Sequence, residues 1–239
     1  MKPYRPSSDD ERHAKATTRM FNTIAGRYDL LNRLMSGGLD MLWRRAMVRT
    51  ITATQSAPVL DACAGTGDVS QLLRDAGARV TAVDAAEEMM RLGREKKDPD
   101  RAIFWCVGDC TALPFAPASF DAATMAFGIR NIADRVGALR ELARVVRPGG
   151  QLLVLEAMPA DSAVVRWFQR LYQRVAFPVL GRFVGANKGA YRYLVSTIEG
   201  FGSASAFEEE LRQAGWVPRS RKWMVGSGVA LFDARLPSN

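Results

Sequence analysis

The sequence contains one histidine and three cysteines among 239 residues. The histidine, His13, lies far along the chain from Cys63, Cys106 and Cys110, so the ligand spacing of a zinc site is missing and we expect no metal. An odd number of cysteines also argues against a disulfide framework. Reduced and mostly buried thiols are the simplest interpretation.

Long apolar stretches are absent as well. No run reaches 18 apolar residues, which argues against a membrane-spanning helix, and the opening MKPYRPSSDDERHAK lacks the apolar stretch of a signal peptide. We therefore expect a cytoplasmic protein. With 48% hydrophobic and 24% charged residues the composition is that of a soluble globular protein, and one domain over residues 1–239 is the simplest organisation.

Acidic residues are too few to balance the basic ones, and the net charge is +8. Such an excess favours a partner that carries phosphate, either nucleic acid or anionic lipid, and its sign alone does not choose between them. Much of it lies in residues 1–50 and 166–192. There, Arg166, Arg170 and Arg174 are spaced four apart beside Trp167 and Phe168, a pattern typical of a basic amphipathic helix at an anionic membrane surface.

The middle of the chain alternates short apolar runs with helical segments. Strands are predicted near residues 58–62, 79–84, 102–108, 120–126 and 151–156, with helices starting at about residues 68, 86, 134 and 203. Two helices (10–35 and 39–53) precede this region, an insertion (160–200) follows it, and two last strands are expected near 216–225 and 227–236. Short connections of this kind predict an α/β fold with a seven-stranded, mostly parallel sheet covered on both faces.

The first predicted strand ends in a glycine turn, LDACAGTGD. Gly65 and Gly67 allow a tight turn and the close approach of a ligand, at the edge of the sheet where α/β proteins bind their ligands. Asp84 ends the second strand 23 positions after Asp61, about the offset at which an acidic residue reaches ribose hydroxyls. This arrangement predicts a ligand of the adenosine type.

The turn departs from the dinucleotide pattern. Ser70 stands where a third glycine would be, and Asp68 at the helix start would repel a pyrophosphate. We expect Asp68 to suit a cationic or zwitterionic ligand instead, such as S-adenosylmethionine. Asp109, just past the third strand in GDCTALPF, could accept hydrogen bonds from an adenine amino group or lie beside the substrate. The fourth strand ends in AFGIRN, at the same edge.

Six motifs carry a resemblance to a known family. FNTIAGRYDLLNRLMSGGLDMLWRR, LDACAGTGD, GDCTALPF, FGIRN, RVVRPGGQLLVLE and YRYLVSTI occur in this order, and over residues 19–234 the chain resembles the ubiquinone/menaquinone biosynthesis C-methyltransferases. The resemblance implies the class I S-adenosylmethionine-dependent methyltransferase (Rossmann-like) fold and methylation of a ring carbon of a prenylated quinol. Cys63 and Ala64 depart from the usual turn. Ala126 replaces a serine found in some ubiquinone-pathway members, which favours demethylmenaquinol over 2-polyprenyl-6-methoxy-1,4-benzoquinol as the substrate.

Site residues follow from the turn and from the resemblance together. The donor, S-adenosylmethionine, is expected to contact Asp61, Gly65, Thr66, Gly67, Asp84, Asp109 and Cys110. Catalysis is expected to involve Tyr28, Asp109, Arg130 and Asn131. No metal takes part in this expectation.

Ring methylation needs a quinol that has lost a hydroxyl proton, and a phenol has a pKa of about 10. The only histidine lies in the N-terminal segment, so the usual general base is missing. Arg130 is a poor base but can stabilise the developing phenolate or hold a water. Asp109 or that water would take the proton, while Tyr28 and Asn131 orient the ring.

The resemblance also implies that successive segments of the chain have different functions. Residues 1–55 would form a helical lid, 56–158 the donor-binding core, 159–200 an insertion for substrate and membrane, and 201–239 the last helix and strands. We expect peripheral contact with the inner face of an anionic membrane, no nucleic acid, and a homodimer. The alternatives are an RNA-directed methyltransferase, for which neither an RNA module nor an Asn/Asp-Pro-Pro-aromatic sequence is visible, and a catalytically silent scaffold.

Overall fold

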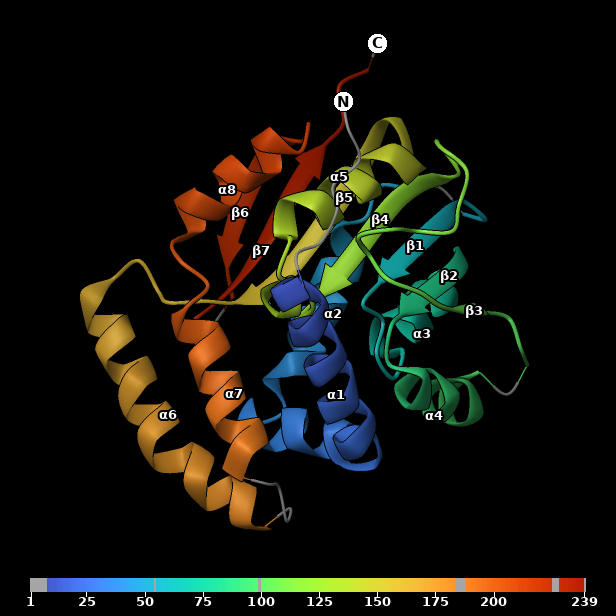
Figure 1. Cartoon of the computed structure of the whole chain (residues 1–239). Coiled ribbons are helices and arrows are strands. Elements are labelled where there is room, and N and C mark those ends of the chain that lie inside the picture. The colour runs from blue at the N-terminus through green and yellow to red at the C-terminus, as the bar shows by residue number, and fades with distance from the viewer. Residues whose placement is uncertain (1–7, 54, 99, 184–187, 225–227, 239) are drawn as a thin grey trace.

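The computed structural model describes residues 8–53, 55–98, 100–183, 188–224 and 228–238. Its centre is a seven-stranded sheet with the order β3-β2-β1-β4-β5-β7-β6 (Figure 1). The strands are β1 (Pro58–Ala62), β2 (Arg79–Asp84), β3 (Phe104–Val107), β4 (Phe120–Ala126), β5 (Val146–Ala157), β6 (Val217–Trp223) and β7 (Val229–Arg235). The first five run parallel, and β7 is antiparallel to both of its neighbours. The predicted seven-stranded, mostly parallel sheet is confirmed.

Helices cover both faces of this sheet. Leu139 of α5 (Arg135–Val145) and Phe207 of α8 (Ala204–Gln213) belong to the core on one face. Met47 of α2 (Leu39–Thr50), Leu73 of α3 (Asp68–Asp75) and Met90 of α4 (Glu87–Lys97) belong to the core on the other. Burial of apolar side chains on both faces explains why the central strands read as short continuous apolar runs.

The remaining helices lie at one end of the sheet. In Figure 1, α1 (Ser8–Met35), α6 (Ala163–Phe183) and α7 (Lys188–Glu199) gather at the end toward which the arrow of β4 points. A short 3-10 helix, η1 (Ile129–Asn131), follows β4 there. None of the helices, as far as the chain is described, is long and apolar enough to cross a membrane.

One strand is longer than expected. The sequence predicts a strand at 151–156, but β5 begins earlier, at Val146, and includes the residues RPGG. Its pairing with β4 shifts register between Phe120 and Ala122. A Cβ at Gly150 would lie 2.8 Å from the carbonyl oxygens of Asp121 in β4 and of Arg147 in β5 itself, so glycine is needed where β5 bends tightly beside β4.

Candidate active site

A cavity of about 550 Å³ opens at the carboxyl ends of the parallel strands, beneath α1. The chain segments that follow β1, β2, β3 and β4 all contribute to its wall. Its lining includes Cys63, Gly65, Asp84–Ala86, Gly108–Thr111 and Ala126–Gly128 from the strand ends, and Lys15, Arg19, Phe21 and Tyr28 from α1. The strand ends predicted to converge therefore do meet at one cavity, and α1 covers it.

A smaller cavity of about 50 Å³ lies next to it and contains Arg130 and Tyr193. Tyr28 and Asn131 line both cavities, so they form part of the wall between them. The structure therefore places the predicted residues in three groups. Gly65, Asp84, Asp109, Cys110, Tyr28 and Asn131 line the larger cavity, Arg130 lines only the smaller one, and Asp61, Thr66 and Gly67 line neither.

The glycine turn is held by the acidic residue at the end of β2. Both Gly65 and Gly67 have positive φ angles, 57° and 78°. The Asp84 carboxylate accepts hydrogen bonds from the amides of Gly65 and Ala86, both at 2.8 Å. Burial raises the pKa of Asp84 despite these bonds. Asp84 thus shapes the turn and faces the cavity at the same time.

Gly67 is required for packing rather than for ligand approach. A Cβ at this position would lie 2.3 Å from the indole ring of Trp105 in β3. At Gly65 the nearest side-chain atom to such a Cβ is the sulfur of Met89 at 3.7 Å, which leaves room. Only Gly65 borders the cavity, so the two glycines have different functions in the turn.

Asp61 lies beneath the turn. Its carboxylate accepts hydrogen bonds from the hydroxyls of Ser70 at 2.5 Å and Thr124 at 3.0 Å, and only 1% of the residue is exposed. Burial raises its pKa to about 6. The structure therefore assigns Asp61 and Ser70 to the link between β1, α3 and β4, which explains why serine stands in the place of a third glycine.

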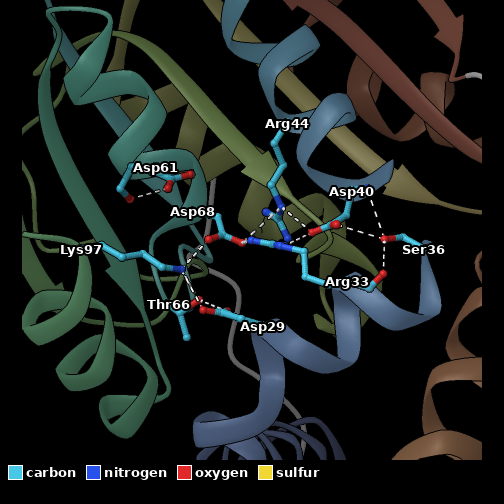
Figure 2. Close-up of polar contacts among 10 residues, drawn as sticks. Asp29, Arg33, Ser36, Asp40, Arg44, Asp61, Thr66, Asp68 and Lys97 are labelled. Atoms are coloured by element: carbon cyan, nitrogen blue, oxygen red, sulfur yellow. Dashed lines mark hydrogen bonds and ion pairs between the residues drawn. The ribbon is translucent and has the colours of Figure 1, made fainter. Parts of the chain in front are cut away.

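The interpretation of Asp68 as a residue facing a cationic ligand was wrong. Figure 2 shows its carboxylate within a cluster of ionic side chains, where it pairs with Lys97 and, at 3.0 Å, with Arg33. The Nε of Arg44 lies 3.7 Å away. Burial disfavours the charged form, but the charges of Arg44, Lys97 and Arg33 outweigh it, and the pKa of Asp68 falls below its usual value. Positive charge from three helices neutralises Asp68, so its charge is not free for a ligand.

This ionic cluster joins the lid to the glycine turn. The Thr66 hydroxyl donates to Asp29 of α1 at 2.5 Å and accepts from the Lys97 ammonium of α4 at 3.2 Å, while Lys97 pairs with Asp29 at 2.9 Å (Figure 2). Arg33 of α1 also pairs with Asp40 of α2. Three carboxylates (Asp29, Asp40, Asp68) and three cations (Arg33, Arg44, Lys97) make up the cluster, which is therefore neutral as a whole.

Arg130 is held by a carboxylate that the sequence interpretation missed. Its guanidinium pairs with Glu156, which is fully buried near the end of β5, and donates to the Phe127 carbonyl at 2.8 Å. Burial acts to lower the pKa of Arg130, but the charge of Glu156 outweighs it and the pKa is raised. Arg130 is thus a permanent cation. The sequence feature that could have indicated Glu156 is a single charged residue directly after the apolar run LLVL.

Two buried polar atoms next to the smaller cavity have no hydrogen-bond partner in the described chain. They are the Nε of Arg130 and the Oδ1 of Asn131, one donor and one acceptor. Tyr193 of α7 also lines this cavity, and its hydroxyl oxygen lies 3.2 Å from the hydroxyl oxygen of Thr17. Burial raises the pKa of Tyr193. The motif YRYL contains this residue, although the sequence alone gave it no function.

Asp109 and Cys110 follow β3 on the opposite wall. Asp109 is exposed, and one of its oxygens accepts from the amide and the hydroxyl of Thr111 at 2.8 and 2.9 Å. The sulfurs of Cys110 and Cys63 are 3.4 Å apart, and both thiols are free. No group of three metal-ligating side chains occurs within the described ranges.

Comparison with known proteins identifies the family. The model of the ubiE/COQ5 methyltransferase family matches residues 8–233. The chain belongs to this family. It is 40% identical over 203 residues to the ubiquinone/menaquinone biosynthesis C-methyltransferase of Paracoccus denitrificans, a match that covers 82% of this chain and 81% of that protein. The resemblance found in the sequence is confirmed, and with it the methyltransferase class.

Relatives with a narrower name match as well. The chain is 40% identical to the demethylmenaquinone methyltransferase of Thermus thermophilus, with 84% of this chain and 92% of that protein covered. The enzyme of the same name from Deinococcus radiodurans is 38% identical, with 96% and 97% covered. Among solved structures, S-adenosylmethionine-dependent methyltransferases from Aquifex aeolicus and Mesorhizobium loti both align with a TM-score of 0.58. They share 16% and 17% identity and cover 83% and 80% of this chain, and 92% and 95% of their own. These two confirm the fold alone.

Proposed function

We propose that this protein transfers a methyl group from S-adenosylmethionine to a ring carbon of demethylmenaquinol, giving menaquinol. The observation that carries the proposal is the pair of adjoining cavities with Tyr28 and Asn131 in their common wall. The larger one has the carboxylates of Asp84 and Asp109 at strand ends, where an adenosine ligand binds in this fold. The smaller one has a buried cation, Arg130, which suits an anionic ring.

The donor supplies an electrophilic methyl group on its sulfonium, and the protein must make the acceptor carbon nucleophilic. A quinol hydroxyl that loses its proton becomes a phenolate, and a buried cation stabilises that charge strongly. Arg130 is already neutralised in part by Glu156, which keeps it in place. Its unpaired Nε is a donor that can bind the phenolate, and Asn131 Oδ1 is an acceptor for a hydroxyl of the ring or for a water.

The proton then needs an acceptor. Asp109 lines the larger cavity and has only one of its oxygens engaged by Thr111, so its second oxygen is available to a water that removes the hydroxyl proton. Methyl transfer forms the carbon–carbon bond and breaks the carbon–sulfur bond. The methylated ring is at first a ketone; its ring carbon gives its proton to a water, and the ketone oxygen takes up a proton, which restores the aromatic quinol.

The apolar lining of the smaller cavity suits the start of an apolar tail, while its volume of about 50 Å³ leaves no room for the tail as a whole. Its lining from α1 and α7 includes Met20, Ile24, Leu31, Met35 and Leu194. Such a surface suits an isoprenoid chain, since burying each methylene contributes about 0.8 kcal/mol. The benzoquinol precursor of ubiquinone carries the same kind of tail and is the alternative substrate.

The test uses purified protein, methyl-labelled donor, and demethylmenaquinol or the 6-methoxy-benzoquinol precursor in separate reactions. We expect label in the naphthoquinol only. Arg130→Lys, which keeps a charge opposite Glu156, should bind the donor normally and lose at least tenfold in turnover. The ammonium is a single nitrogen, so it cannot pair with Glu156 and also place a donor where the Nε of Arg130 lies. Label in neither quinol, or full turnover by the variant, would contradict the proposal.

We further propose that the enzyme works in the cytoplasm, bound peripherally to the inner face of an anionic membrane through α6. Trp167 and Phe168 are 60% and 59% exposed on this helix, beside Arg166, Arg170 and Arg174. Figure 1 shows α6 at the outer edge of the molecule. The Tyr172 hydroxyl of α6 donates to the carbonyl of Met35 at 3.1 Å, and Met35 lines the smaller cavity. A lipid substrate could thus pass from the bilayer to Arg130 over a short path.

Sedimentation with phosphatidylglycerol vesicles tests this second proposal. Trp167→Ala/Phe168→Ala should reduce the bound fraction about tenfold, and zwitterionic vesicles should bind the wild-type protein weakly. Phe104→Ala is the matched control, because Phe104 is 63% exposed on β3 and away from α6. Equal loss in both variants, or none in either, would argue against α6 as the contact.

A further inference from the structure

Two cations of the lid face the larger cavity without a partner. Lys15 and Arg19 both belong to α1 and line the cavity, and both are exposed. Neither side chain forms a hydrogen bond or ion pair with any residue of the described chain. By contrast, Arg33, farther along the same helix, is bound by two carboxylates. The lid therefore carries unused positive charge only where it covers the cavity.

The spacing of these two residues makes this charge unfavourable in an empty protein. Positions 15 and 19 are four apart on one helix, so their side chains lie next to each other. Like charges at this spacing destabilise a helix, whereas a shared anion between them would reverse the effect. The arrangement therefore favours an anionic group in the cavity.

The proposed donor brings one such group. The amino-acid end of S-adenosylmethionine carries a carboxylate, and placing it in a cavity without a partner would be costly. The other charged residues in the wall, Asp84, Asp109 and Asp134, are themselves carboxylates. They can serve the ribose, the adenine or the cationic groups of the donor, but they repel its carboxylate.

Three donors of the glycine turn are already engaged and do not serve this carboxylate. The amide of Gly65 is bound to Asp84 at 2.8 Å, and the amide of Gly67 is bound to the carbonyl of Ala64 at 2.9 Å. The Thr66 hydroxyl donates to Asp29. Among the described residues of the wall, the positively charged groups are therefore those of Lys15 and Arg19.

We propose that Lys15 and Arg19 together bind the carboxylate of S-adenosylmethionine. The inference rests on the donor proposed above and adds the part of the molecule that recognises its amino-acid end. Because the carboxylate would bridge the first half of α1 to the strand ends, donor binding holds this half of the lid over the cavity. The second half of α1 is already held by the ionic cluster around Thr66.

The experiment compares two ligands that differ in this carboxylate alone. Titration calorimetry would measure the Kd values of S-adenosylmethionine and of its decarboxylated form for the wild-type protein and for Lys15→Met/Arg19→Gln. We expect the wild-type protein to prefer the carboxylate form at least tenfold. The double variant should lose this preference by binding S-adenosylmethionine more weakly while binding the decarboxylated form no worse. High salt should reduce the wild-type preference, since exposed charges are screened.

Controls separate binding from folding. Arg27→Gln removes an exposed cation from the same helix outside the cavity wall and should keep the wild-type preference. Arg19→Lys, with the charge kept, should retain most of it. The double variant should melt no earlier than the wild-type protein, because a repulsive pair has been removed.

The possible failures are distinguishable. If the wild-type protein prefers the carboxylate form and the double variant does so equally, the assignment of Lys15 and Arg19 is overturned while the donor stands. If the wild-type protein binds neither compound, the donor itself is refuted, and the inference is refuted with it.

Discussion

The ion pair between Arg130 and Glu156 gives the most direct test of how the site is held. Glu156→Gln keeps the size and one oxygen acceptor but removes the charge opposite Arg130. The side chain of Arg130 is only 7% exposed and that of Glu156 is fully buried, so the variant leaves a cation without its counter-charge in the interior. Breaking a buried pair in this way costs about 3 to 5 kcal/mol, and the retained hydrogen bond favours the lower end.

For a chain of this length about 3 kcal/mol corresponds to a fall in Tm of about 6 to 12 °C. Thermal unfolding followed by circular dichroism would measure it, and turnover with the quinol would be measured on the same samples. Glu95→Gln is the control, since Glu95 pairs with Arg91 on the exposed surface of α4, and its Tm should not change measurably. Arg130→Met/Glu156→Leu removes both charges and should recover most of the stability without turnover. A Tm for Glu156→Gln within about 2 °C of the wild-type value would refute the reasoning.

Three further predictions concern the turn and the lid. Burial raises the pKa of Asp61 to about 6. Between about pH 4 and pH 6 the folded state therefore holds a proton that the unfolded state has already lost, so the stability of the wild-type protein falls as the pH rises through this window. In urea unfolding, the free energy of unfolding of Asp61→Asn should therefore rise by about 2 kcal/mol relative to that of the wild-type protein between about pH 4.5 and pH 7.5. A difference that stays constant over this pH range would contradict the prediction. Gly67→Ala should unfold at a much lower urea concentration than Gly65→Ala. An alanine at position 65 meets only the strain of a left-handed backbone, about 1 to 2 kcal/mol, whereas at position 67 its Cβ would also lie 2.3 Å from an indole. Equal urea midpoints of the two variants would argue against the packing role of Gly67. In a double-mutant cycle on the unfolding free energy, Lys97→Met and Asp29→Asn should be coupled by about 1 kcal/mol, and strictly additive effects would exclude a working pair.

Most of the sheet was predictable because burial on two faces leaves a local signal. The apolar runs at β1, β2 and β4 were placed at the observed boundaries. β3 is shorter than the predicted 102–108, and its neighbourhood is organised by Asp98, which binds the amides of Ala102 and Ile103 and the Trp105 indole. The start of β5 was missed because proline and glycine usually end an element, whereas here they lie within a strand.

The site was predictable where a residue follows a strand end, and unpredictable where its charge is matched from elsewhere in the chain. The position of Asp84 at the cavity could be inferred from its offset along the chain. The same kind of argument failed for Asp68, because its partners come from residues 24 to 35 positions away. Glu156 and Tyr193 were missed for the same reason, since their roles arise from distant segments that fold against Arg130 and Thr17.

One excursion of the chain adds to the wall of the smaller cavity without adding a strand to the sheet. After Ala157 the chain leaves the sheet, forms α6 and α7, and returns through α8 to the last two strands. These two helices add no strand, yet α7 supplies Tyr193 and Leu194 to the cavity of Arg130. Changes in this excursion can therefore alter one part of the wall around Arg130, while the strand ends that line the larger cavity stay as they are. A hybrid that carries a relative's excursion on this sheet would keep the larger cavity and the α1 part of the smaller one, and would differ only in what α7 contributes.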